Sequence, residues 1–164
     1  AEFEFASPGP WYYEQQSLGL NARMTELQAA LGLSQLARLD AMHARREALA
    51  DRYDMLLGRL PLILPARQAD RRSAWHLYAV EIDEKRTAVT REAAFAALRE
   101  AGIGVNVHYI PIHTQPFYRR LGFSAGDFPA AERYYARTLS LPLFPALTEA
   151  QQERVVDVLR AVLA

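Results

Sequence analysis

Apolar residues fall at helical spacing from about residue 25 to residue 57, and no other feature of the sequence constrains the fold as strongly. The pattern predicts one long N-terminal helix over about 25–57, or two helices in succession, with Gly32 as the weak point. Gly58 and Pro61 follow directly and predict where the helical segment ends, since neither residue favours a helix interior.

Two short runs, residues 75–82 and 103–110, are rich in aromatic and β-branched side chains and therefore predict half-buried strands. A helix with well-marked ends is predicted between them. Thr90 is a good N-cap, and Gly102 can adopt the left-handed conformation that ends a helix.

The C-terminal part of the sequence predicts two more helices separated by an extended segment. Pro129 suits the first turn of a helix that runs to about Thr138, and residues 139–145, which contain two prolines, cannot continue it. Thr148 and Gln151 have the spacing of a capping box, which predicts the start of the last helix.

The fold class that follows is α+β, with a long N-terminal helix and a small, mostly antiparallel sheet packed by helices. Residues 1–10 contain Ser-Pro-Gly-Pro and are interpreted as an irregular lead-in or an expression artefact. Residues 11–164 form one region, in which the long helix precedes a small α+β domain over about 60–164.

Composition excludes several classes of protein. The formal net charge is +0 and the pI is about 7.2, so the sequence does not predict a nucleic-acid-binding protein. No apolar run approaches the roughly 20 residues that span a bilayer, and the absence of cysteine favours the cytoplasm. Four arginines recur every seven residues with carboxylates between them, which predicts a solvated helix face: Arg38, Arg45, Arg52 and Arg59.

Hydrogen-bonding side chains cluster in the segment that follows residue 103. Any one of them can be a satisfied strand or loop residue, but clustering on a loop after a strand favours a binding site. His108 and His113 do not share a helical face and have no carboxylate close by in sequence, so no metal site is predicted. The cluster consists of Asn106, His108, Tyr109, His113, Gln115 and Tyr118.

Four segments have a residue order that resembles that of a known family, which composition alone does not reveal: residues 11–32, 73–78, 102–118 and 139–142. The third reads Gly-Ile-Gly-Val-Asn-Val-His-Tyr-Ile-Pro-Ile-His-Thr-Gln-Pro-Phe-Tyr. In order and spacing they resemble sugar-nucleotide aminotransferases of the DegT/StrS type. The residues that follow Trp11 and those of the third segment are similar to the corresponding residues of the pseudaminic acid branch. Enzymes of that branch transaminate a UDP-linked 4-keto-6-deoxy-2-acetamido hexose.

The resemblance implies the small C-terminal domain of a fold-type I enzyme that uses pyridoxal 5'-phosphate, takes the amino group from glutamate and works as a homodimer. In such enzymes a lysine forms a Schiff base with the cofactor, whose ring acts as the electron sink. Lys85 is the only lysine here, and it lies outside every matching segment among charged residues. We therefore expect the Schiff-base lysine to lie upstream of this chain. The chain by itself should be inactive.

The resemblance also implies roles for individual residues. Asn21 matches an asparagine that reaches across a dimer to the cofactor phosphate, and Arg23 beside it is a second candidate for cofactor binding. His108, Tyr109 and His113 match positions near the sugar-nucleotide pocket. Two alternatives remain open from sequence: a stand-alone, non-catalytic module that self-associates through the 25–57 helix, and a sugar-nucleotide dehydratase relative in which the lysine is replaced.

Overall fold

The computed structural model describes residues 20 and 22–163. The chain divides into two compact units, Ala1–Ala37 and Arg38–Ala164. In the described part of the first unit, helix α1 (Glu26–Leu36) begins at Thr25 with a capping box that Gln28 completes.

The 25–57 segment forms two helices in succession, which is the second of the two alternatives that the sequence left open. Helix α2 (Leu39–Leu57) begins after Arg38, whose φ of −109° and ψ of 1° lie outside the helical region. The break therefore falls at residues 37–38 and not at Gly32, where the helix continues without interruption. Gly58 caps α2, as the sequence predicts.

Within the described residues the second unit contains a three-stranded antiparallel sheet in the order β1-β2-β3. In β2, Tyr78, Val80 and Ile82 are buried and alternate with half-buried residues, as a packed strand requires. The elements of this unit after α2 are β1 (Leu62–Ile63), β2 (Tyr78–Ile82), α3 (Arg91–Glu100), η1 (Ile112–Thr114), α4 (Pro116–Arg119), α5 (Pro129–Arg137), β3 (Thr138–Leu141) and α6 (Glu149–Leu163).

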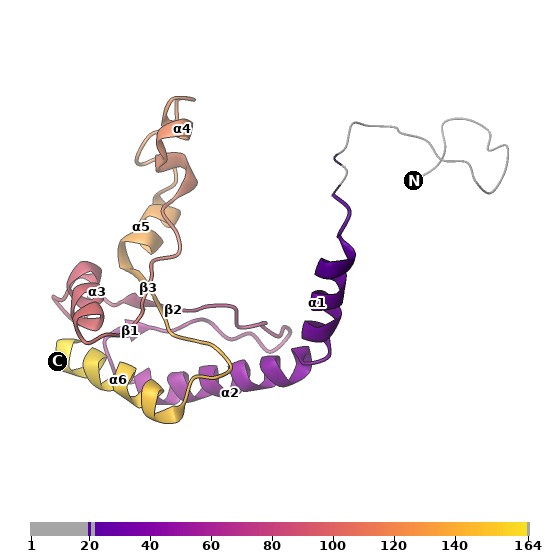
Figure 1. Ribbon diagram of the computed structural model, residues 1–164. Coiled ribbons are helices and arrows are strands. Elements are labelled where there is room, and N and C mark those ends of the chain that lie inside the picture. The colour runs from indigo at the N-terminus through magenta and orange to yellow at the C-terminus, as the bar shows by residue number, and fades with distance from the viewer. Residues whose placement is uncertain (1–19, 21, 164) are drawn as a thin grey trace. The chain divides into compact units, whose positions relative to one another are not determined.

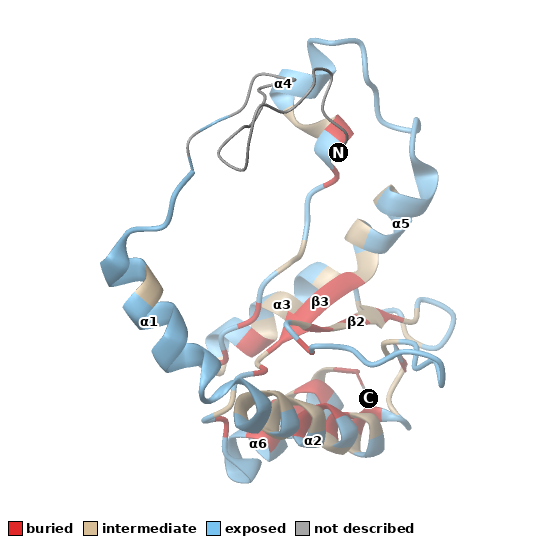
Figure 2. Cartoon of the chain, turned by 90° about the vertical axis from the view of Figure 1, so that its right-hand side faces the viewer, coloured by how far each residue is buried: buried red, intermediate tan, exposed pale blue. Residues whose placement is uncertain are grey.

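Helices α2 and α6 lie side by side along one face of the sheet, and α3 packs against α6 and β3 (Figure 1). The Tyr53 ring of α2 lies 4.9 Å from the Tyr78 ring of β2, and the Tyr53 hydroxyl donates to the carbonyl of Pro142. The buried residues gather in this layer, whereas α4 and the loop after it are exposed and lie beyond α5, away from the sheet (Figure 2).

Arginines of α2 bind the loops around the sheet. Arg46 Nη1 donates to the carbonyls of Trp75 at 3.0 Å and Leu143 at 2.8 Å, and Arg45 donates to the carbonyl of Leu147 at 2.8 Å. Arg52 pairs with a carboxylate of α6 at 2.6 Å. The predicted solvated face is therefore wrong for Arg45 and Arg52, which are half-buried because they join α2 to the C-terminal part of the chain.

The two strand predictions are only partly confirmed. The first strand is shorter than expected, because Trp75 has a φ of 48° and the strand begins at Tyr78. Residues 103–110 do not form a regular strand, since their pairing with β3 is a single bridge between Asn106 and Ser140.

The helix-end predictions are confirmed. Thr90 accepts from the third residue of α3, and Gly102 has a φ of 74°. Pro129 opens α5, and Thr148 and Gln151 exchange the two hydrogen bonds of a capping box. In the described part of the chain no helix has the length and apolar content that crossing a membrane requires.

Replacing Arg46 with methionine should lower the free energy of unfolding by about 2–3 kcal/mol, because charge-assisted hydrogen bonds to two loops are lost and buried carbonyls are left without a donor. Urea unfolding of the purified chain measures the change. Arg133→Met is the matched control, since Arg133 is an exposed residue of α5 whose side chain forms no hydrogen bond with any described residue. Equal stability of the two variants would contradict the role given to Arg46.

Gly102→Ala should cost about 1–2 kcal/mol, because an L-residue with a Cβ is strained at positive φ. Steric crowding is not the cause, since an added Cβ would meet only Arg154 Nη2, at 4.0 Å. Gly104→Ala, two residues away in open space and without a positive φ, should be close to neutral in the same unfolding experiment. A similar loss in both variants would show that backbone conformation is not responsible.

Candidate functional site

The segment after α3 carries the predicted sugar-site residues and is held to β3 at one point. Ile103 and Val105 are buried while Gly104 and Asn106 are exposed, so this part of the segment has one buried face, as a strand does. The backbone amide of Asn106 donates to the Ser140 carbonyl at 3.3 Å, and Ser140 returns the bond at 2.8 Å. This bridge places Ser140 beside the start of the histidine-containing segment.

His108 is fixed by a chain of hydrogen bonds whose direction can be assigned. The amide of Val107 can only donate, so its partner at 2.8 Å is the Asn106 oxygen Oδ1, and the Asn106 nitrogen Nδ2 faces His108 Nε2 at 3.2 Å. His108 Nε2 therefore accepts, and Nδ1–H donates to Ser140 Oγ at 2.8 Å. Both ring nitrogens of His108 are thus occupied by the chain itself.

His113 is held differently, because the described residues bind only one of its nitrogens. Its Nε2 lies 2.7 Å from Oε1 of Glu132 on α5, and its ring lies 4.8 Å from the ring of Phe128. The side chain of His113 is buried, at 7% exposure. Among the described residues, none forms a hydrogen bond with Nδ1 of this histidine.

Glu132 is ionised at neutral pH. Hydrogen bonds from His113 and from the backbone amide of Gly126 stabilise the charged form and lower the pKa of the Glu132 carboxyl. A pocket of about 350 Å³ opens beside the histidine and is mainly aromatic and aliphatic, which suits a ligand with an apolar face and a few polar groups. It is lined by Pro111, Ile112, His113, Tyr118, Phe123, Phe128 and Ala131.

The other predicted site residues are not gathered at this pocket. Tyr109 is 68% exposed, and its ring meets only the edge of the His108 ring, at 4.5 Å. Arg23 is exposed in the N-terminal unit, where it lines a shallow pocket of about 490 Å³ together with Gln28. Asn21, the other cofactor-binding prediction, lies outside the described residues.

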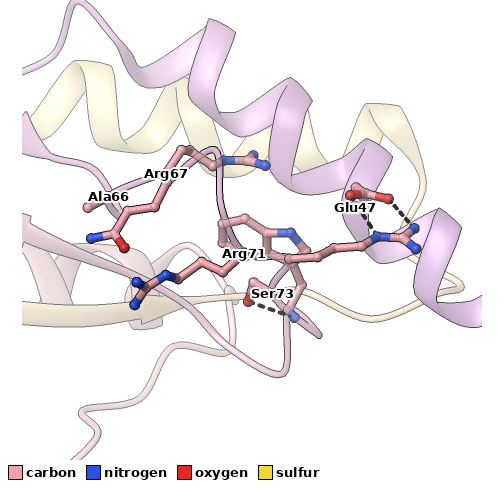
Figure 3. A pocket seen from close by; sticks show the side chains of 8 residues that line it. Glu47, Ala66, Arg67, Arg71 and Ser73 are labelled. Carbon is pink, nitrogen blue, oxygen red and sulfur yellow. Dashed lines mark hydrogen bonds and ion pairs between the residues drawn. The ribbon is translucent and has the colours of Figure 1, made fainter.

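A second pocket of this unit, of about 520 Å³, is rich in arginine (Figure 3). Its arginines already have acidic partners: Arg67 pairs with Asp51 and Asp54, Arg72 with Glu47, and Arg71 with its sequence neighbour. The Arg67 guanidinium also stacks 4.2 Å above the ring of Trp75. Because these charges are compensated, the pocket is a network of ion pairs that anchors the loop before β2 and is a poor anion site.

Residues 20 and 22–163 contain no group of three His, Cys, Asp or Glu side chains that could hold a metal ion. Sequence reasoning missed two residues that organise the site, Glu132 and Ser140. Ser140 lies in the 139–142 segment, which carried a resemblance without an assigned role. Glu132 lies 19 positions after His113 on another helix, and no local pattern connects the two.

Comparison with known proteins places this geometry in context. The chain is 46% identical over 162 residues to the spore coat polysaccharide biosynthesis protein SpsC of Bacillus subtilis, and the match covers 97% of this chain but 42% of SpsC. The chain thus spans less than half the length of this curated relative.

Two solved sugar aminotransferases have the same fold over nearly all of the chain. The PLP form of the putative sugar aminotransferase Spr1654 from Streptococcus pneumoniae has a TM-score of 0.78 at 28% identity, covering 94% of this chain and 40% of that one. Helicobacter pylori PseC, an aminotransferase involved in the biosynthesis of pseudoaminic acid, has a TM-score of 0.79 at 27% identity, covering 96% and 42%. These near-equal values confirm the predicted fold class without singling out one branch.

The sequence model of the DegT/DnrJ/EryC1/StrS aminotransferase family matches residues 6–160. Since this match includes nearly the whole chain and the folds agree, the chain belongs to the DegT/DnrJ/EryC1/StrS aminotransferase family.

Proposed function

We propose that the parent protein is an aminotransferase that uses pyridoxal phosphate to move an amino group from glutamate to a nucleotide-linked 4-keto-deoxy sugar. The observation that carries the proposal is His113, a buried imidazole beside a mainly aromatic pocket, with one nitrogen that no described residue binds. A sugar offers an apolar ring face and several hydroxyls, which match such a wall. This chain would supply that wall of the sugar site.

His113 is a better candidate than His108 for direct contact with the sugar. A hydroxyl could bind His108 only by displacing Asn106 or Ser140, whereas none of the residues that the structure describes binds Nδ1 of His113. Tyr109, which is exposed, is proposed to contact the nucleotide or the sugar from a position outside the pocket.

The described residues do not fit the covalent attachment of pyridoxal phosphate. Lys85 is exposed to solvent in the turn after β2, where its backbone amide donates to Asp83 Oδ1. The Schiff-base lysine is therefore assigned to the part of the parent protein that this chain does not span. The contribution proposed for this chain is contact with the cofactor phosphate through Asn21 and Arg23.

The exact sugar is a finer proposal. The sequence resemblance favours the UDP-linked sugar of the pseudaminic acid branch, and PseC has a similar fold. SpsC is named for spore coat polysaccharide biosynthesis and has the higher sequence identity. The class of product that we propose is an amino sugar made in the cytoplasm for a cell-surface polysaccharide.

A homodimer is part of the same proposal. No residue of α1 is buried, and Leu27, Leu31 and Leu36 are 85%, 63% and 63% exposed. A helix of 11 residues is marginal by itself in water, so these side chains support packing against protein outside the described residues. The partner that we propose is a second subunit, because the resemblance implies active sites that two subunits share.

The isolated chain should give no turnover with added pyridoxal phosphate, glutamate and a panel of UDP-linked 4-keto sugars, whereas the full-length parent should form 2-oxoglutarate with at least one of them. The physical reason is the missing amine, and a coupled assay of 2-oxoglutarate measures it. Lys85→Ala in the full-length protein is the control and should leave the rate within about twofold, as for an exposed residue outside the site. Turnover by the isolated chain that Lys85→Ala abolishes would contradict the proposal.

A further inference from the structure

Glu132 makes contacts that bring two distant parts of the chain together. Its oxygen Oε1 accepts from His113 Nε2 at 2.7 Å and from the backbone amide of Gly126 at 2.8 Å. Gly126 has a φ of 97°, a conformation that glycine adopts without strain. One carboxylate oxygen on α5 thereby holds both the histidine and the loop that lines the pocket through Phe123 and Phe128.

The contact also determines which nitrogen of His113 carries its proton. A carboxylate without a proton can only accept, so Nε2 is the protonated nitrogen of the neutral ring. Nδ1 then keeps its lone pair and accepts hydrogen bonds. Without Glu132, either nitrogen could carry the proton, and the ring could rotate.

We propose that Glu132 is the positioning residue for His113, which thereby presents Nδ1 as an acceptor to a donor group of the bound sugar, a hydroxyl or an amide N–H. This inference rests on the proposed function and adds to it a residue and a direction of hydrogen bonding. The loop that lines the pocket and the imidazole of His113 are both held by the same oxygen of Glu132.

The test uses the full-length parent enzyme with the sugar nucleotide varied at saturating glutamate. Glu132→Leu should raise KM for the sugar nucleotide roughly 10- to 100-fold, as expected when a buried donor loses a charged partner. The kcat and the KM for glutamate should stay within about threefold, because uniform binding of the sugar is what is lost. Glu132→Gln, which keeps an oxygen acceptor, should stay within about threefold of wild type in all constants.

Glu81→Leu is the matched control. Glu81 is a half-buried glutamate that also pairs with α5, through Arg137 at 2.7 Å, but it does not contact His113. Glu81→Leu should leave KM for the sugar nucleotide within about threefold of wild type, because it removes an ion pair with α5 and leaves the contact between Glu132 and His113 in place.

A second variant separates positioning from simple support of the loop. His113→Phe keeps a ring against Phe128 and removes both nitrogens, so Glu132→Leu in that background should raise KM by no more than about twofold further. An equal effect of Glu132→Leu in both backgrounds, or an equal effect of Glu81→Leu, would overturn the inference alone. Absence of turnover by the wild-type enzyme with every sugar nucleotide would overturn the proposed function and this inference with it.

Discussion

The hydrogen bonds from Arg46 to the carbonyls of Trp75 and Leu143 hold the second unit of the chain together. These carbonyls belong to the segment before β2 and the segment after β3, so one guanidinium on α2 fixes the entry to one strand and the exit from its neighbour. Arg45 extends the same support to Leu147, just before α6. The sheet that results is small, and its central and edge strands depend on loops that a helix holds in place.

This framework positions the site through Ser140, which lies on β3. Its backbone pairs with Asn106 and its hydroxyl accepts from His108, so the start of the histidine-containing segment is tied to the sheet. The far end of the segment is tied to α5 through His113 and Glu132. The two histidines thus have separate physical roles. Both ring nitrogens of His108 form hydrogen bonds within the chain, whereas Nδ1 of His113 has no partner among the described residues and can bind a ligand.

Local sequence signals predicted helix ends well and long-range pairing poorly. Caps such as Thr90 and Thr148 bind a backbone amide three residues further on, so a short sequence pattern is enough to predict them. The side chains of residues 103–110 are typical of a strand, yet β3 pairs with that segment only at Asn106. Tertiary contacts outweigh local strand propensity here. The break before α2 falls at Ala37 and Arg38, and neither glycine nor proline marks it in the sequence. The histidines could be found by resemblance, but the contact between Glu132 and His113 joins residues on different elements and needed the structure.

The central claim is that this chain forms the sugar side of an aminotransferase site whose reactive amine lies elsewhere in the parent protein. A crystal structure of the full-length protein with its sugar nucleotide bound tests it most directly. The claim predicts a hydroxyl or amide of the sugar within about 3.2 Å of His113 Nδ1, the ordinary range of a hydrogen bond. A sugar bound away from the aromatic pocket, with His113 in contact only with protein, would contradict it.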